Sequence, residues 1–274
     1  MCEARAMADA AARTPVVFVH GLWLHADSWG PWIDLFREHG YDASAPGWPG
    51  DSETVAETRA DATSVAGHGI QAIVEHYTAS IGELPAKPIV IGHSFGGLIA
   101  QRLLGENNAA AAVAIDPAPV KGVLFLPLSA LRVAGIALRD PRNRDRAVSL
   151  SAGQFRYGFG NAISETESDE LFERWTIPSP GKPLFEAASA NLMPHSPASV
   201  ATGNPARGPL LLTAGGKDHT VPPTLSRQAA KLYRHSSAVT EVKEFPDRGH
   251  SLTIDSGWRE VADAVLTWLS EHGL

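Results

Sequence analysis

The sequence has little of several features that define other protein classes. Its single cysteine, Cys2, allows no intrachain disulfide and no thiolate metal cluster. Basic charge is also scarce, because 23 Lys and Arg stand against 30 Asp and Glu, giving a formal net charge of −7. Such a chain lacks the broad basic surface that neutralises phosphates. We therefore expect no nucleic acid partner and no disulfide framework.

Long hydrophobic runs are missing as well. The most apolar later segment, residues 122–138, is interrupted by Pro127 and Arg132 and is shorter than a membrane span. Charged residues also break up residues 1–14, where a secretory signal would be continuously apolar. We expect a cytoplasmic protein without stable membrane insertion, in which residues 1–13 form a flexible leader and 122–138 a helix that covers an apolar surface.

What the chain does have is an alternation of two patterns. Short apolar runs, each followed by a loop, are typical of strands buried on both faces. They are residues 16–19, 89–91, 112–115 and 210–212. Between them, apolar residues recur three and four positions apart, most clearly over 70–81, as on one face of a helix. This alternation predicts an α/β fold with a doubly wound, mostly parallel sheet and ligands at the carboxyl ends of its strands.

One stretch interrupts the alternation. Residues 116–209 are too many for a single crossover connection between two strands. We interpret residues 118–205 as an inserted, mainly helical cap, and residues 14–117 together with 206–274 as the core.

The strongest motif is the G-x-S-x-G pattern of residues 92–96, which follows an apolar run and precedes a helical pattern. Glycines on both sides permit the sharp, strained turn that lifts a serine hydroxyl clear of a sheet. We therefore expect Ser94 to be a nucleophile. His93, just before it, is expected to point away from substrate and to be structural.

A serine hydroxyl needs a base, and the base needs a carboxylate to orient it. His250 lies between the predicted last strand and the final helical pattern, where a loop would bring it back over the sheet. Asp218 follows the run 210–212 and is our preferred acid. Asp116 also ends a buried-strand pattern and stays open as a substitute or an assistant.

The remaining site residues follow from the same logic. The oxyanion hole is expected from the backbone N–H groups of Leu22 and Phe95. For substrate binding we expect Trp23, His25, Tyr157 and Trp175. Histidine and acid spacings show no metal-binding pattern, so no metal and no other cofactor is expected.

With these residues assembled, the chain resembles the α/β-hydrolase superfamily, in its serine esterase and lipase branch, along nearly its whole length. The resemblance implies Ser94 as nucleophile, His250 as base, Asp218 as acid and Leu22 and Phe95 as oxyanion donors. It also implies one antiparallel strand near the start, which the short leader can omit. Dehalogenases and epoxide hydrolases of this superfamily have an aspartate nucleophile where this chain has Ser94.

These expectations together predict a carboxylesterase that cleaves small to medium apolar esters through an acyl-enzyme. Lactone, amide, carbon–carbon or peracid chemistry at the same triad, as in cofactor-free haloperoxidases, is the alternative within enzymes. A ligand-binding protein on a hydrolase scaffold is the alternative from another class, since a fold does not establish a function. The natural substrate, its chain length and the oligomeric state do not follow from the sequence.

Overall fold

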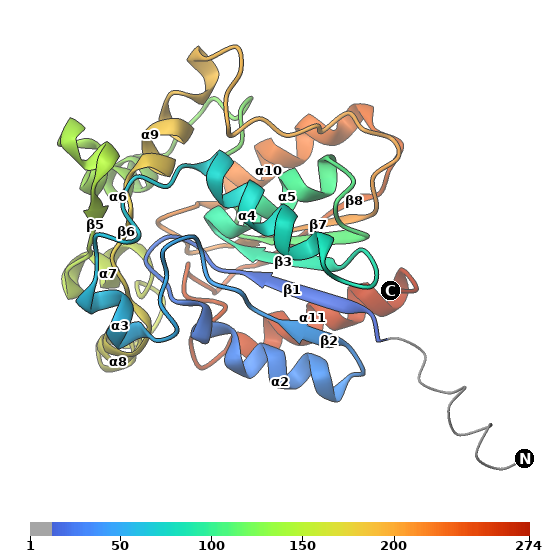
Figure 1. The fold of residues 1–274 in the computed structure, drawn as a ribbon, viewed down its shortest axis with the longest axis horizontal. Helices are drawn as coiled ribbons and strands as arrows, with labels where there is room; N and C mark the ends of the chain where they lie inside the picture. Colours follow the sequence, from blue (N-terminus) through green and yellow to red (C-terminus); the bar gives the residue numbers. More distant parts are fainter. Residues whose placement is uncertain (1–12) are drawn as a thin grey trace, which may run out of the picture.

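A computed structural model describes residues 13–274 of the chain. The leader expected at residues 1–13, apart from Arg13, and Cys2 lie outside the described residues. The central feature is a sheet of six strands in the order β2-β1-β3-β4-β7-β8, with helices on both faces (Figure 1). Every neighbouring pair in this sheet is parallel. The predicted α/β class and doubly wound sheet are therefore confirmed, and no antiparallel strand joins the sheet within residues 13–274.

The strands alternate their side chains between two separate cores. In β1, Val17 and Val19 face one core, whereas Val16 and Phe18 face the other. This explains why the four inner strands β1, β3, β4 and β7 read as continuous apolar runs, because both of their faces are buried. The strands of the sheet are β1 (Pro15–Val19), β2 (Asp42–Ser44), β3 (Ile89–His93), β4 (Ala111–Ile115), β7 (Leu210–Gly215) and β8 (Thr240–Phe245).

The helices form two layers, one on each face of the sheet (Figure 1). One layer contains α4 (Ile70–Gly82), α5 (Phe95–Gly105) and α10 (Pro223–Leu232), and the other α2 (Gly30–Glu38) and α11 (Trp258–Glu271). The expected helix over 70–81 is therefore confirmed. Shorter pieces are α3 (Val55–Ala60) and the 3₁₀ turns η1 (Ala26–Trp29) and η4 (Tyr233–His235). No helix within residues 13–274 has the length and apolar character needed to cross a bilayer.

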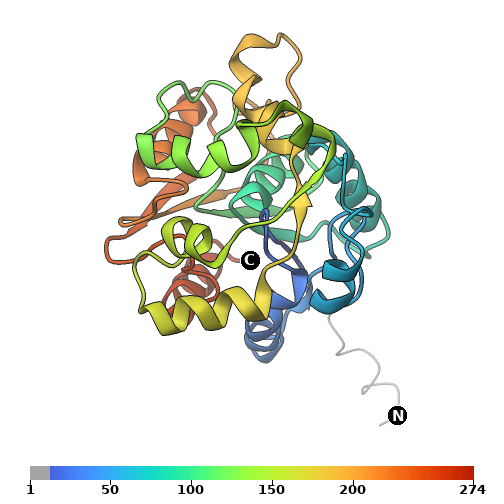
Figure 2. The same cartoon turned by 90° about the vertical axis from the view of Figure 1, so that its left-hand side faces the viewer.

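The segment between β4 and β7 lies at one end of the sheet (Figure 1), and this end faces the viewer in Figure 2. It is mainly helical, as expected, and a two-stranded antiparallel ribbon of β5 and β6 crosses it. Its elements are α6 (Leu128–Leu138), η2 (Pro141–Asp145), β5 (Ala147–Val148), α7 (Ala152–Gly158), α8 (Glu165–Trp175), β6 (Ser179–Pro180), α9 (Lys182–Ala188) and η3 (Ala190–Leu192). We refer to residues 118–205 as the cap, a boundary that stays a prediction.

The helix expected over 122–138 is shorter than predicted. It begins only at Leu128, with Pro127 as its N-cap residue. Proline disfavours helical backbone in the residue before it, Leu126, which keeps the helix from extending further back, and residues 122–126 are non-helical. This stretch lies close to Ser94, because Val123, Leu124 and Leu126 line the cavity that opens there.

Candidate active site

Ser94 sits on the turn between β3 and α5 with φ 55° and ψ −120°, a conformation that costs energy in any residue with a Cβ. The turn is possible only because its flanking glycines have no side chains. A Cβ on Gly92 would lie 2.0 Å from the carbonyl oxygen of Gly96, and a Cβ on Gly96 would lie 2.1 Å from that of Val19. The Ser94 N–H donates to the Ile115 carbonyl at 2.9 Å, which ties the turn to β4.

The loop after β1 lies against this turn. A Cβ on Gly21 would be 2.7 Å from the Cβ of Ser94, so only glycine lets the two segments come this close. Leu22 follows directly, and Phe95 is the first residue of α5. Within residues 13–274, no backbone group accepts a hydrogen bond from the N–H of Leu22 or of Phe95. Two unpaired N–H donors are therefore available beside the serine.

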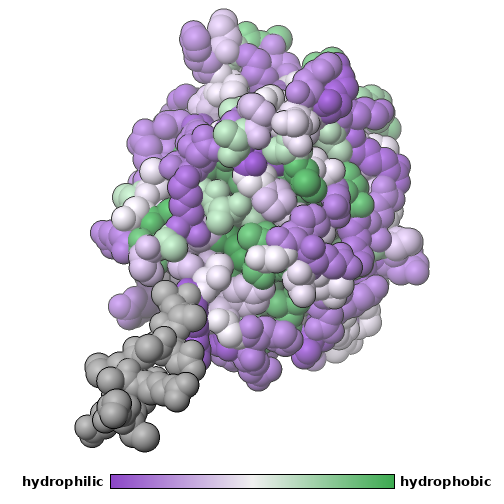
Figure 3. All heavy atoms as spheres, turned by 90° about the vertical axis from the view of Figure 1, so that its right-hand side faces the viewer, coloured by the Kyte–Doolittle hydropathy of each residue, from purple (hydrophilic) through white to green (hydrophobic). Residues whose placement is uncertain are grey.

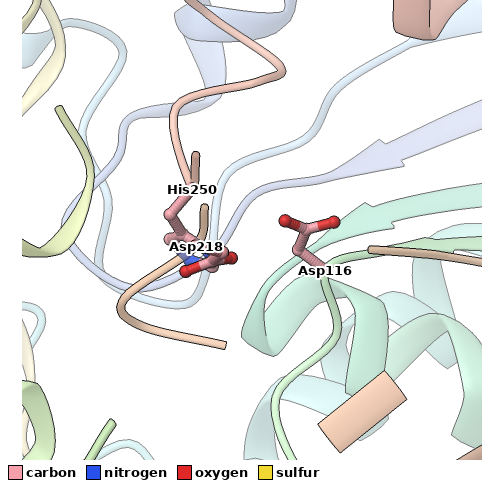
Figure 4. Close-up of side chains that lie close together, drawn as sticks. All are labelled: Asp116, Asp218 and His250. Atoms are coloured by element: carbon pink, nitrogen blue, oxygen red, sulfur yellow. The ribbon is translucent and has the colours of Figure 1, made fainter. Parts of the chain in front are cut away.

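His250 and Asp218 come from the loops after β8 and β7 and form a buried pair (Figure 4). His250 Nδ1 lies 2.5 Å from Asp218 Oδ2. The other oxygen, Oδ1, accepts the N–H groups of Thr220 at 2.6 Å and Val221 at 2.8 Å, which holds the carboxylate in place. His250 Nε2 is buried and has no hydrogen-bond partner among residues 13–274, so no bond to the Ser94 hydroxyl is formed.

Asp116, the alternative acid, ends β4 close to this pair (Figure 4). Its carboxyl oxygens accept the Gly215 N–H at 3.0 and 3.1 Å and the Thr213 hydroxyl at 3.2 Å. Asp218 rather than Asp116 therefore bonds the imidazole. Asp116, Asp218 and His250 are the one trio in the described part of the chain whose spacing suits a metal ion. Their hydrogen bonds to one another and to N–H and hydroxyl groups fit a proton-sharing cluster better.

Burial sets the charge of these groups. It lowers the pKa of His250 to about 4, which leaves a neutral imidazole at neutral pH. It raises the pKa of Asp218 to about 7, against the hydrogen bonds from Asp116, Val221 and Thr220, which lower it. Burial and the nearby charge of Asp218 raise the pKa of Asp116 well above its usual range. Of the two carboxyl groups, Asp116 is the one that keeps its proton.

Two residues that the sequence did not assign to the site contact His250. The ring of His93 lies 4.5 Å from that of His250, centroid to centroid. Phe159 of the cap approaches it from another side at 4.7 Å, edge to face. His93 is absent from the residues that line the cavity at Ser94, as its expected orientation implies, but its contact with His250 was not predicted. Only the position of His93 next to the serine could have indicated it.

A cavity of about 320 Å³ opens at Ser94. Leu22, Trp23 and Phe95 line its sheet end, as do Thr220, Val221 and Leu225 from the segment after β7, and mostly apolar cap side chains line the rest. Only three of its lining residues are polar, and two of these already have partners. Asn191 bonds the Gly122 N–H and the Val123 carbonyl, and the Thr220 hydroxyl donates to the Gly158 carbonyl. The serine hydroxyl is the third, so the wall is apolar apart from the reacting end.

Of the four residues expected to bind substrate, only Trp23 lines the cavity at Ser94. The Trp23 indole N–H donates to the Val148 carbonyl of β5, which fastens the loop to the cap. His25 caps η1 and its Nε2 lies 3.1 Å from the Ser52 carbonyl oxygen. Tyr157 lines a surface groove beneath Arg132, and Trp175 lines another beside Trp258. We therefore do not carry these three into the proposed site.

His20, at the end of β1, has a structural contact. Its Nε2 lies 3.0 Å from a carboxylate oxygen of Asp51, and its ring stacks on that of Trp48. The loop of residues 47–51 is a turn, in which the Trp48 N–H donates to Asp51 at 2.9 Å. These contacts hold the loop of residues 47–51 against the end of β1.

Comparison with known proteins places this geometry in a family context. The sequence model of the alpha/beta hydrolase family matches residues 16–264. None of the curated proteins compared with the chain matches it.

Solved structures are similar over nearly the full chain. A monoacylglycerol lipase of Paleococcus ferrophilus has 23% identity and a TM-score of 0.65, and the match covers 94% of both chains. A methylesterase from Arabidopsis has 17% identity and a TM-score of 0.64, with 94% of this chain and 99% of that chain covered. A protein of Mycobacterium tuberculosis described as a putative non-heme bromoperoxidase has 23% identity and a TM-score of 0.65, with 94% and 91% covered. At these identities the three structures support the fold.

Proposed function

Because the chain belongs to the alpha/beta hydrolase family, we propose that it is a serine carboxylesterase that cleaves esters with an apolar acyl group. Ser94 attacks the carbonyl carbon, and the alcohol leaves to give an acyl-enzyme. Water then attacks the acyl group by the same route and restores the free serine. Ser94, His250 and Asp218 have the roles of nucleophile, base and orienting acid.

His250 Nε2 takes the serine proton as the carbonyl is attacked and gives it to the leaving alcohol. Two observations support this role: the imidazole is neutral at neutral pH, and its Nδ1 side is held by Asp218, so Nε2 is the free basic nitrogen. Bringing the Ser94 hydroxyl within reach of Nε2 requires a movement of the serine side chain. Such bonds commonly tighten only when substrate binds.

The oxyanion that forms on the attacked carbonyl needs donors that have no other partner. The N–H groups of Leu22 and Phe95 meet this requirement, and both residues line the cavity beside Ser94. Phe95 also begins α5, whose amino end carries partial positive charge. The charge that develops in the transition state is thus stabilised by groups that are already in place.

The observation that carries the ester proposal is an apolar cavity that ends at a strained serine beside two unpaired N–H donors. A charged or strongly polar acyl group would lose its hydration there and find no side-chain partner. An alkyl or aryl acyl group fits this wall. The names of two similar structures, a monoacylglycerol lipase and a methylesterase, denote ester-cleaving enzymes and agree with this choice.

Hydrolysis of p-nitrophenyl esters of graded acyl length tests the proposal. We expect turnover with an optimum at one chain length, and its loss in Ser94→Ala. Ser270→Ala, at an exposed position on α11 far from the site, is the matched control and should keep full activity. Retained turnover in Ser94→Ala would contradict the assignment.

The same residues would also serve lactone, amide, carbon–carbon or peracid chemistry. Substrates of these classes belong in the same panel, with saturable binding of an apolar ligand as a separate readout. Turnover of one of them without turnover of any ester would replace the ester proposal. Binding without any turnover would favour a ligand-binding role.

A further inference from the structure

Exposed apolar side chains lie at the cavity and in the segments next to it. Six of the eight large hydrophobic residues that are exposed within residues 13–274 lie in two short segments, 124–131 and 192–193. We call these six the apolar rim; they are Leu124, Phe125, Leu128, Leu131, Leu192 and Met193. Leu128 and Leu192 are 85% and 84% exposed, far more than apolar side chains of this size usually are.

The two segments of the apolar rim are held together by hydrogen bonds. The Asn191 side chain accepts the Gly122 N–H and donates to the Val123 carbonyl, both at 2.8 Å. Lys121 Nζ reaches over to the Pro194 carbonyl at 2.9 Å. Leu124 and Leu131 belong both to the rim and to the cavity wall. The rim is therefore one surface that continues inward to Ser94.

The charge around the apolar rim differs from that of the whole chain. Although the sequence has 30 acidic residues, none occurs from residue 117 to 139, from 187 to 217 or from 219 to 240. These three segments supply most of the cavity lining. They carry cations nevertheless, among them Lys121, Arg132 and Arg139. Lys231 lies on α10, which is bonded to the rim through Gln228 and the Phe125 carbonyl at 3.1 Å.

Among residues 13–274, the opposite end of the molecule differs. Figure 3 shows a face on which hydrophilic residues surround separate hydrophobic ones. The other two exposed hydrophobic residues, Val239 and Val242, lie at or next to β8, where Glu241, Lys243 and Glu244 alternate with them. Within the part of the chain that the structure describes, large exposed apolar side chains without acidic residues next to them in sequence therefore occur beside the cavity.

We propose that the apolar rim docks on a lipid surface with anionic headgroups, so that acyl chains pass from the lipid phase directly into the cavity. The side chains of the apolar rim enter the acyl region of the lipid, while the lysines and arginines named above contact the headgroups. A protein partner or a second copy would seal the cavity mouth, and a second copy would also place like charges opposite one another. Docking itself does not require catalysis; only its effect on lipid hydrolysis rests on the proposed function.

Flotation with vesicles tests docking without turnover. The wild-type chain is mixed with vesicles of phosphatidylcholine alone or with roughly a third of phosphatidylglycerol. We expect it to float with the anionic vesicles, and the Leu128→Ser/Leu192→Ser variant to bind them about tenfold less. Neither residue lines the cavity. Val239→Ser/Val242→Ser is the matched control and should float like the wild type.

Thermal unfolding of both variants and the wild type, measured in parallel, shows that they are folded, and hydrolysis of water-soluble p-nitrophenyl acetate is followed as a separate readout. Equal flotation of the rim variant and the wild type, or no flotation of the wild type, would overturn the docking proposal. Equal binding to both vesicles would overturn its anionic part. A wild-type dimer that the rim variant dissociates, seen by light scattering without flotation, would assign the rim to self-association. Missing ester turnover with intact flotation would instead count against the proposed esterase alone.

Discussion

The two sides of the cavity are built differently. On the sheet side, the loops after β1, β3, β7 and β8 are fixed by backbone hydrogen bonds and by glycines that have no room for a Cβ. On the cap side, the wall consists, apart from Asn191, of apolar side chains, which act mainly by filling space. Under the proposed function, the sheet side would determine whether a reaction occurs, and the cap side would determine which substrate fits.

The largest expected effect is on the sheet side. Asp218→Asn keeps the shape of the site but removes the carboxylate that orients His250. We therefore expect kcat for a p-nitrophenyl ester to fall roughly 10³- to 10⁴-fold. Asp116→Asn is the matched control, because Asp116 does not bond the imidazole. It should lose about tenfold or less. Equal losses in the two variants would mean that the two carboxyl groups act as one unit.

The pH dependence of kcat/KM tests the sheet side further. Burial raises the pKa of Asp218 to about 7, so the carboxyl is protonated below that pH and supports His250 poorly. His250 itself, with its pKa lowered to about 4, stays neutral throughout. We therefore expect kcat/KM for a neutral ester to rise with pH, with a midpoint about 7, and then to level off. A kcat/KM that stays constant through neutral pH and falls only near pH 4 would mean that the loss of activity at low pH comes from protonation of His250 instead.

A change on the cap side should alter selectivity and leave the chemistry intact. Ala134 on α6 lines the cavity, and Ala134→Leu adds three carbons to that wall. The acyl-length optimum should shift to shorter chains, with kcat/KM for the longest accepted ester reduced about tenfold relative to a short one. Ala137→Leu on the same helix, at a buried position outside the cavity, is the control for general disruption of α6. An unchanged acyl-length optimum in Ala134→Leu would mean that the cap wall does not select the substrate.

The smallest effect is expected where the cap is fastened to the core. Arg59 on α3 donates to the Thr176 and Glu173 carbonyls at the end of α8, each at 2.8 Å. Arg59→Met should lower the free energy of unfolding by about 1–3 kcal/mol, or Tm by about 2–8 °C, in thermal unfolding. The exposed Arg142, whose side chain pairs with Asp140, gives the control Arg142→Met, which should change Tm by roughly 1 °C or less.

The sheet side is also the side that the sequence predicts well. Ser94 is identifiable because its turn needs glycines at fixed offsets, and the apolar runs around it have a pattern that only buried parallel strands require. The pairing of His250 with Asp218, now seen as a 2.5 Å contact, follows from the order of the loops along the chain. The edge strand β2, with three residues, is too short to give a pattern.

The cap side is predicted poorly for a physical reason. Its aromatic residues were expected at the cavity, but Tyr157 and Trp175 lie in other grooves. Where such a side chain points depends on how the cap helices pack, and their apolar faces look alike in sequence. The cavity wall is made instead of small and medium residues such as Ala118 and Val120, which no local motif identifies.

The most direct test of the central claim is covalent capture of the nucleophile. The protein is treated with an apolar fluorophosphonate, which mimics the attacked ester, and the labelled peptide is mapped by mass spectrometry. We predict one adduct on Ser94, absent in Ser94→Ala and formed more slowly in Asp218→Asn. Labelling of another residue, or none while an ester is hydrolysed, would contradict the account.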